Sequence, residues 1–315
     1  MEGTEQIHGF YSHSEGFEKY GGGIRNIMRY RVKTFMSNKQ LLILLIFSLL
    51  LTGCSGKITD NYSKDTSLLK ITAFSVGKAD SILIQQEDHS ILIDAGEKED
   101  GGKILEELSE RKIDSLDYLI ITHYDKDHVG SAAEILQNIP VETVLCPDYE
   151  GTREEYFAFL QETQKNQNSS YVTEITEIDL GEMHLIIYPA ENPKQYMETD
   201  QEYDNDLSLV CSLSYGEKSF LFAADIEKKR TNQMLEEGIL GEYDWIKIPH
   251  HGNYRKSLKN LLETIHPKFA VISTSIEEPA EDKMIQLMGD QSIEYKITYD
   301  SDVVTYCDGS KIWIE

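Results

Sequence analysis

The chain has 315 residues, with 30 basic and 55 acidic side chains and a formal net charge of −25. Residues 1–53 hold six of the basic and four of the acidic residues, so residues 54–315 carry a charge of −27. A field of this sign repels polyanions at long range. Unless a local basic patch forms, it argues against a general nucleic-acid binder and against stable binding of duplex DNA.

The N-terminal part predicts export rather than folded structure. Residues 41–51 are apolar except for Ser48 and follow basic residues, a pattern typical of the apolar region of a secretory signal. The run is too short to span a bilayer as a helix. It ends in Leu51-Thr52-Gly53-Cys54, which resembles the lipobox of bacterial lipoproteins. The alternative is a buried core helix, which is disfavoured because no polar face interrupts the run. We therefore expect an extracytoplasmic protein that is anchored to the cell membrane by a lipid on Cys54.

The predicted signal and lipobox divide the chain into three regions. Residues 1–53 form an N-terminal extension and signal peptide, residues 54–67 form a polar tether, and residues 68–315 suit one large domain. In the domain, strands are expected over residues 69–76, 81–85 and 91–96, and a helix over residues 103–111. The remaining cysteines have no paired spacing, so we expect small buried side chains and no disulfide framework.

The most informative stretch is Thr122-His123-Tyr124-Asp125-Lys126-Asp127-His128-Val129-Gly130, which places two imidazoles and two carboxylates within six residues. A buried strand is expected before it, over residues 116–121, and a helix after it, from residue 131. The polar side chains therefore lie in a strand-to-helix loop, where a rigid scaffold can hold a site. Neutral imidazole and ionised carboxylate are ligands of divalent metals. The alternative interpretation is a solvated polar loop.

Further polar residues stand beside predicted strands in the second half of the chain. Asn205 and Asp206 precede an apolar segment. Two interpretations are open for these residues: one of them binds a metal, directly or through water, or they form a turn before a strand. Asp225 ends the apolar strand over residues 218–224, where it is either a metal ligand or the N-cap of the helix expected at residues 227–236. His250 and His251 follow another apolar strand.

These motifs resemble the signature of the metallo-β-lactamase-fold hydrolases, His-x-His-x-Asp-His. Asp125 takes the place of the middle His, and this variant resembles the hydrolase domain of bacterial competence DNA-uptake proteins of the ComEC type. The resemblance also covers the opening strands with Asp80 and Asp94, and the run Ile248-Pro249-His250-His251-Gly252. The chain departs from the family in five further places: Ser75 replaces an Asp, Lys78 a Gln, Ala79 a Gly and Ala224 a Gly, and no His stands near Asp206.

The resemblance implies an α/β (α+β) fold, an αββα sandwich of two mixed β-sheets flanked by helices. It also implies two divalent metal ions, Zn²⁺ or Mn²⁺, and the carboxylate at position 125 raises the odds of manganese. The implied metal ligands are His123, Asp125, Asp127, His128, Asp225 and His250, with Asp206 as a further candidate. Asp225 is expected to lie between the two ions.

Other residues are expected to act beside the ligands. Asp80, Asp94 and Asn205 are expected to hold the ligand loops by hydrogen bonds. The alternative for Asp94 is a turn or helix-capping residue. Asp127 and His251 are expected to take part in catalysis, with His251 near the substrate. Which of His250 and His251 binds metal is open at this stage, and we favour His250.

The function implied is hydrolysis by a metal-activated water. A phosphodiesterase or nuclease-like activity is favoured, with a small phosphodiester, a nucleotide or single-stranded DNA as the substrate. One alternative is the hydrolysis of a lactone, amide or thioester, and another is a non-catalytic binding or scaffold lipoprotein with a decayed site. Proteins of the ComEC type join this domain to a multi-span pore, so a membrane-channel partner is a further expectation.

Overall fold

A computed structural model describes residues 68–166, 168–193, 196–197 and 203–315. The predicted signal peptide, the lipobox at Cys54 and the tether lie outside the described residues, so they stay predictions. In the part of the chain that is described, no helix is both long and apolar enough to cross a membrane. Cys146, Cys211 and Cys307 are buried and free, as expected for small apolar side chains.

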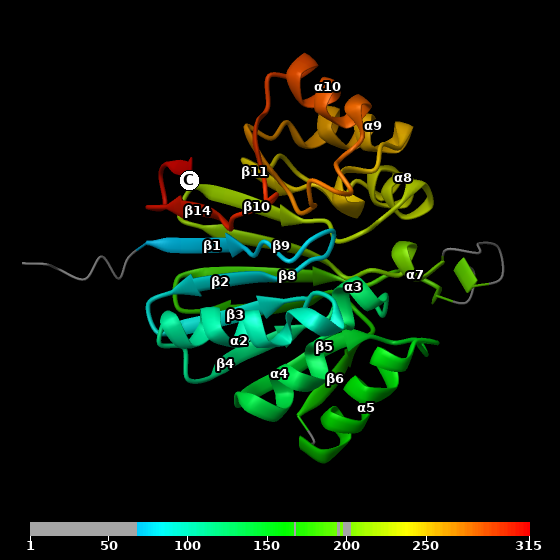
Figure 1. Ribbon diagram of the computed structural model, residues 1–315. Helices are drawn as coiled ribbons and strands as arrows, with labels where there is room; N and C mark the ends of the chain where they lie inside the picture. Colours follow the sequence, from blue (N-terminus) through cyan, green and yellow to red (C-terminus); the bar gives the residue numbers. More distant parts are fainter. Residues whose placement is uncertain (1–67, 167, 194–195, 198–202) are drawn as a thin grey trace, which may run out of the picture. The chain divides into compact units, whose positions relative to one another are not determined.

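Two mixed β-sheets form the centre of the described domain (Figure 1). In the first sheet, β1 to β3 form an antiparallel meander, and β3 to β6 run parallel to one another. Its strands are, in spatial order, β15 (Ile312–Ile314), β14 (Val303–Cys307), β1 (Leu69–Ala73), β2 (Ile82–Gln86), β3 (His89–Ile93), β4 (Leu116–Ile120), β5 (Val141–Pro147) and β6 (Ser169–Val172).

The second sheet is antiparallel on one side and parallel on the other. Strands β7 to β10 alternate in direction, and β10 to β13 run parallel. Its strands are, in spatial order, β13 (Glu294–Ile297), β12 (Phe269–Ile272), β11 (Trp245–Lys247), β10 (Lys218–Phe222), β9 (Val210–Tyr215), β8 (Met183–Tyr188) and β7 (Thr176–Leu180).

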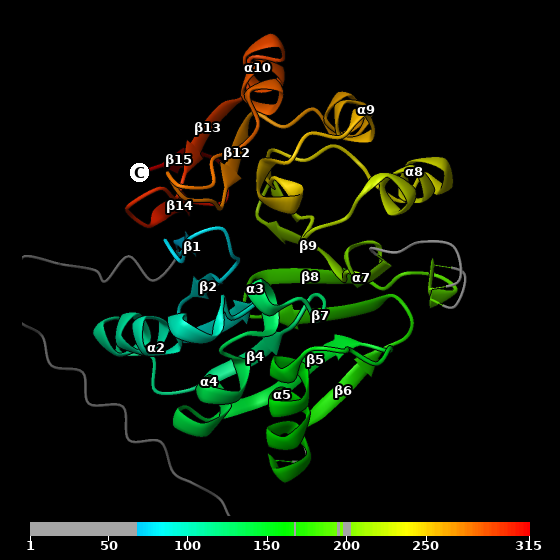
Figure 2. The same ribbon diagram turned by 45° about the vertical axis from the view of Figure 1, so that its right-hand side comes forward.

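Helices cover the outer face of each sheet (Figures 1 and 2). α2 (Gly101–Glu110), α4 (Ala132–Asn138) and α5 (Glu154–Asn166) cover the first sheet, and α8 (Lys228–Glu237), α9 (Lys256–Ile265) and α10 (Asp282–Asp290) cover the second. Each long helix buries one apolar stripe, as Leu258, Leu261 and Leu262 show on α9. The predicted αββα sandwich is therefore confirmed.

The two sheets pack face to face through a continuous apolar core. Side chains alternate along each strand, so Trp245 of β11 faces the core while its neighbour Ile246 faces the helices. The indole of Trp245 packs against Phe220 and Phe222, and its Nε1 donates a hydrogen bond to Thr305 Oγ1 at 3.0 Å. Residues from both sheets thus fix how the sheets are placed against each other.

Short elements lie at the ends of the strands. They are the helices α3 (Lys126–Val129) and α7 (Tyr203–Asp206) and the 3₁₀ segments η1 (Lys98–Asp100) and η2 (Pro249–Gly252). The single-turn helix α3 lies within the nine-residue motif, where the sequence predicted only a loop. The backbone N–H of Leu209, just before β9, donates to the Thr122 carbonyl at 2.9 Å and so ties the motif to the second sheet.

Candidate metal centre

Four side chains from both sheets converge at one edge of the sandwich. Asp127 and His128 come from α3, which follows β4, whereas Asp225 and His251 follow β10 and β11. One ligand atom from each of the four lies within 4.8 Å of all the others. His128, Asp225 and His251 are buried, and about a quarter of the Asp127 side chain is exposed. These four residues form what we call the metal cluster.

The imidazoles at this site are oriented by hydrogen bonds to Nδ1. Nδ1 of His128 donates to Asp94 Oδ2 at 2.8 Å, and Nδ1 of His251 donates to the Ser273 carbonyl at 3.0 Å. Nδ1 of His123 lies 3.0 Å from Thr122 Oγ1, which itself donates to Asp94. Because each Nδ1 is engaged, each Nε2 is the nitrogen presented to the cluster.

The Nε2 atoms of His123, His128 and His251 are buried and form no hydrogen bond within the described residues. Nε2 of His128 lies 3.3 Å from Asp225 Oδ2, and Nε2 of His251 lies 3.2 Å from the same oxygen. Two ligands about 2.1 Å from one ion are separated by about 3.0 Å at a right angle and about 3.4 Å at the tetrahedral angle. The spacing therefore fits a shared divalent cation, and the donor set has the right chemistry for one.

The electrostatics of the cluster show how strongly its members interact. Burial alone would lower the pKa of His251, but Asp225 and Asp127 outweigh it and raise that pKa to about 9. Burial likewise opposes the charge on His128, and Asp225 and Asp94 raise its pKa well above the ordinary value. In turn, His251 and His128 overcome the burial of Asp225 and hold its pKa well below the usual range.

His123 and Asp125 lie beside the metal cluster, as the motif predicts. The rings of His123 and His128 have centroids 4.0 Å apart, and His123 Nε2 lies 3.9 Å from Asp125 Oδ2. Burial and the neighbouring His128 hold the pKa of His123 well below its ordinary value, so its imidazole is a neutral donor. These two residues are therefore neighbours of the metal cluster and further candidate ligands.

The structure places His251, and not the favoured His250, in the metal cluster, so metal binding by His250 stays a prediction. The His251 side chain is buried in the cluster, whereas His250 Nδ1 lies 2.9 Å from Glu227 Oε1. The physical reason is the backbone, because both residues adopt left-handed conformations, with φ of 48° and 52°. This turn brings the His250 amide to Asp225 Oδ1 at 3.2 Å and directs the two imidazoles to different places.

Asp206 lies at the start of α8 and outside the metal cluster, and its role as a ligand stays a prediction. Its Oδ1 accepts hydrogen bonds from the backbone N–H groups of Glu227 and Arg230 at 2.9 and 3.1 Å, at the start of α8. Asp225 is not the residue that caps this helix. The neighbouring Asn205 is buried, and its Oδ1 forms no hydrogen bond within the described residues, so its supporting role stays a prediction.

Asp94 and Asp80 occupy the places expected of supporting residues. Asp94 accepts hydrogen bonds from the Thr122 amide at 2.7 Å and the Thr122 hydroxyl at 2.8 Å, in addition to the one from His128. Asp80 joins the ligand loop through its backbone N–H, which donates to the Asp127 carbonyl at 3.0 Å. Burial raises the pKa of Asp94, although His128 and Thr122 oppose that effect.

Lys247 is the residue at this site that the sequence analysis missed. It is the last residue of β11, its side chain is 1% exposed, and its Nζ forms a salt bridge with Asp80. The signal in the sequence was a charged residue at an inward-facing position of an otherwise apolar strand, Trp245-Ile246-Lys247-Ile248. A lysine buried this completely requires a partner.

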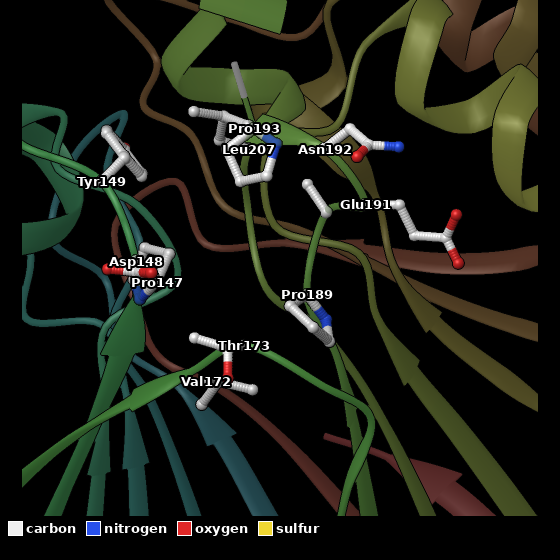
Figure 3. A pocket seen from close by; sticks show the side chains of 11 residues that line it. Pro147, Asp148, Tyr149, Val172, Thr173, Pro189, Glu191, Asn192, Pro193 and Leu207 are labelled. Atoms are coloured by element: carbon white, nitrogen blue, oxygen red, sulfur yellow. The ribbon is translucent and has the colours of Figure 1, made fainter. Parts of the chain in front are cut away.

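A pocket of about 440 Å³ adjoins the loop of the nine-residue motif. Figure 3 shows Pro147, Asp148 and Tyr149 on one side of this pocket and Pro189 and Glu191 across from them. Its wall is linked to the metal loop, since the Tyr149 hydroxyl accepts a hydrogen bond at 2.9 Å from the amide that follows His123. The pocket is thus connected to the motif loop through Tyr149.

Comparison with known proteins agrees with this fold. Residues 75–191 match the family model described as the metallo-beta-lactamase superfamily. The metallo-beta-lactamase fold protein YhfI from Bacillus subtilis aligns with a TM-score of 0.50 and 12% identity, over 79% of this chain and 99% of that chain. A variant of the β-hydroxylase CmlA aligns with a TM-score of 0.51 and 12% identity, over 75% of this chain and 53% of that chain. Residues 75–191 are thus similar to the metallo-beta-lactamase superfamily, and the described domain has the fold of these solved structures.

Two curated proteins resemble the chain in sequence. Recombination protein 2 from Haemophilus influenzae is 26% identical over 242 residues, which are 76% of this chain and 27% of that protein. ComE operon protein 3 from Bacillus subtilis is 24% identical over 203 residues, which are 63% of this chain and 25% of that protein. The chain thus spans about a quarter of the length of these relatives. The predicted resemblance to competence proteins is confirmed at this modest identity.

Proposed function

We propose that the domain is a metal-dependent hydrolase of phosphodiesters that uses two divalent ions, Zn²⁺ or Mn²⁺. One observation carries the proposal: three buried imidazoles have Nδ1 engaged, and each presents an Nε2 without a hydrogen bond within the described residues. Such groups argue against a decayed site, because each buried polar atom without a partner lowers the folding stability by about 1–3 kcal/mol. A divalent cation is the species that satisfies them.

Each residue of the site has a role in this proposal. Asp127, His128, Asp225 and His251 hold one ion, and His123 and Asp125 hold the other together with Asp225. Bound divalent ions supply Lewis acidity and lower the pKa of a water. Asp125 and Asp127 are about a quarter exposed, so the substrate approaches from their side.

The substrate class follows from the charges around the mouth of the site. Arg153 is 55% exposed, and its Nη2 lies 3.6 Å from Asp125 Oδ1, where a guanidinium can pair with phosphate oxygens. A donor set rich in carboxylates suits Mn²⁺ better than an all-imidazole set does. The charge of −27 on residues 54–315 favours a small phosphodiester or nucleotide over a polymer, with single-stranded DNA as the polymer that remains open. The name of Recombination protein 2 agrees with a substrate of the nucleic-acid type.

The test uses the domain with Mn²⁺ or Zn²⁺ and three kinds of substrate: bis-p-nitrophenyl phosphate, single-stranded DNA and a lactone or thioester. We expect hydrolysis of the phosphodiester, and a loss of at least about 100-fold in Asp225→Asn, which removes the carboxylate that both groups of ligands share. Asp282→Asn, at the exposed first turn of α10, is the matched control. If only the lactone or thioester is hydrolysed, hydrolysis of that substrate class replaces the phosphodiesterase proposal. If the protein hydrolyses none of the substrates after Mn²⁺ or Zn²⁺ is added back, the proposal of a metal-dependent hydrolase is refuted.

We further propose that the protein acts outside the cytoplasm, anchored by a lipid on Cys54, with a membrane-channel protein as a possible partner. The support is the apolar run followed by Leu51-Thr52-Gly53-Cys54. Cys54→Ser is expected to abolish lipid labelling and to leave the protein unprocessed or released from membranes. Full lipid labelling in that variant would refute the anchor.

A further inference from the structure

Lys247 points into the space between the two sheets at the edge that carries the metal cluster. In β11, Trp245 faces the core between the sheets and Ile246 faces the helices, so Lys247 faces the core again. The strand continues into Pro249 and the two histidines, which places the ammonium at the end of the core nearest the site. Lys247 pairs along the sheet with Phe222 of β10, and its ammonium has the carboxylates of Asp80 and Asp225 beside it.

The ammonium lies between two carboxylates from different sheets. Lys247 Nζ forms a salt bridge with Asp80 Oδ2 and lies 3.9 Å from Asp225 Oδ1. Asp80 stands in the connection between β1 and β2, and its backbone N–H and carbonyl bond to Asp127 and Gly96, respectively. Lys247 therefore connects Asp225 to the segment that supports the α3 loop.

The two oxygens of Asp225 face different partners. Oδ2 lies 3.3 Å from His128 Nε2 and 3.2 Å from His251 Nε2, and it is the oxygen that faces the metal cluster. Oδ1 faces the opposite way, where it accepts a hydrogen bond from the His250 amide at 3.2 Å and has Lys247 Nζ nearby. The ammonium and the amide thus fix the rotation of this carboxylate.

A buried ion pair of this kind is poor evidence for stability. Removing two charges from water costs several kcal/mol per ion, and well-packed apolar residues are often as stable or more so. Folding energy therefore does not explain the pair, whereas its position beside Asp225 of the metal cluster does.

We propose that Lys247 is a positioning residue of the metal centre. With Asp80 it forms a buried clamp that turns Asp225 so that Oδ2 is presented to the metal cluster. This inference rests on the proposed metal-dependent function and assigns Lys247 no contact with the substrate. Charge and positioning predict opposite effects of Lys247 on metal affinity. By charge alone, the ammonium would weaken the binding of a nearby metal cation, so its loss would tighten that binding. If Lys247 positions Asp225, the loss of Lys247 weakens metal binding.

The test measures the affinity of the metal-free protein for Co²⁺ by competition with a chelator, together with the visible spectrum of bound Co²⁺. Lys247→Met keeps an unbranched side chain that is one atom shorter and removes the charge. We expect about 10- to 100-fold weaker binding and an altered spectrum, because the carboxylate loses its orientation. Tighter binding in Lys247→Met would overturn the proposal and leave only charge repulsion.

A second variant separates the clamp from general damage to the fold. In Asp80→Asn the ammonium loses its partner and turns to Asp225, where it competes with the metal, so binding is expected to weaken further than in Lys247→Met. The double variant removes that competing ammonium and should recover about tenfold relative to Asp80→Asn, because the two residues act as one unit. Strictly additive losses in the double variant would contradict the clamp.

Lys218→Met is the matched control, since Lys218 Nζ pairs with Asp244 at 3.1 Å on the same sheet and away from the metal cluster. Its Co²⁺ affinity should equal that of the parent, and melting of every metal-free variant in EDTA checks the fold. A parent that binds no Co²⁺ would refute both the metal-dependent function and this inference. A parent that binds Co²⁺ while Lys247→Met binds equally well would refute this inference alone.

Discussion

Asparagine substitutions at His250 and His251 offer a matched test of the metal centre. The two residues are neighbours, and both have left-handed backbone conformations, which asparagine tolerates better than most residues do. Only His251 belongs to the metal cluster, whereas His250 is paired with Glu227. The same change in chemistry at adjacent positions should therefore have very different effects.

The magnitudes follow from the contacts. His251→Asn removes one of four clustered donors and leaves Asp127 and Asp225 without the nitrogen that lies 3.2–3.3 Å from them. Loss of a residue that merely supports a ligand costs about 10- to 100-fold in metal affinity, so loss of a donor should cost at least about 100-fold. That factor is about 2.7 kcal/mol of binding free energy.

His250→Asn should change metal affinity by less than about threefold. It removes an ion pair with Glu227, whose side chain keeps its second contact with Arg255 at 2.7 Å. A partly exposed pair of this kind contributes about 1 kcal/mol or less to stability. The assay is chelator competition with dialysed protein, with melting in EDTA as the check of folding. Loss of metal in His250→Asn with retention in His251→Asn would refute the assignment.

Four further predictions concern the metal cluster and its surroundings. In the metal-free protein the pKa of His251 lies at about 9 instead of 6.5, so calorimetry in buffers of different ionisation enthalpy should detect proton release on metal binding at pH 7 that declines towards pH 9. Since that folded-state pKa is raised, the associated stabilisation is complete below about pH 6.5 and lost as the pH rises through 9, which melting in EDTA should reveal. Asp94→Asn should weaken metal binding by about 10- to 100-fold, because Asp94 orients His128, and an unchanged affinity would contradict that role. Arg153→Gln should raise KM for bis-p-nitrophenyl phosphate by about tenfold, or about 1.4 kcal/mol, with metal content unchanged; equal KM values would exclude Arg153 from substrate binding.

The sequence was sufficient for the fold because the patterns that predict it are local. Alternating strands, amphipathic helices and the ordered motifs from Asp80 to His251 placed the two sheets and the loops between them. The boundaries moved by a few residues, and the one-turn helix α3 was missed because its four residues are too few to show a helical period.

Backbone geometry places His250 and Asp206 outside the metal cluster. Nothing in His250-His251 reveals that both residues adopt positive φ, so the choice between them depended on the resemblance alone. Asp206 was considered a ligand because its spacing from Asp225 suited one, whereas the start of α8 required a cap at that place. Lys247 was overlooked because strand patterns rarely place an ammonium inside a core, and its partner Asp80 is 167 residues away.

The origin of the cluster from two sheets has a mechanical consequence. His128 belongs to the first sheet and Asp225 to the second, and roughly 100 residues of chain separate them. An ion held by both would therefore act as a reversible cross-link between the two halves of the sandwich. Because such a link exists only in the folded chain, each bound ion would shift the unfolding equilibrium by mass action. Resistance to proteolysis would then follow the concentration of free metal around the protein, so that the domain would persist where the metal is plentiful and be degraded where it is scarce.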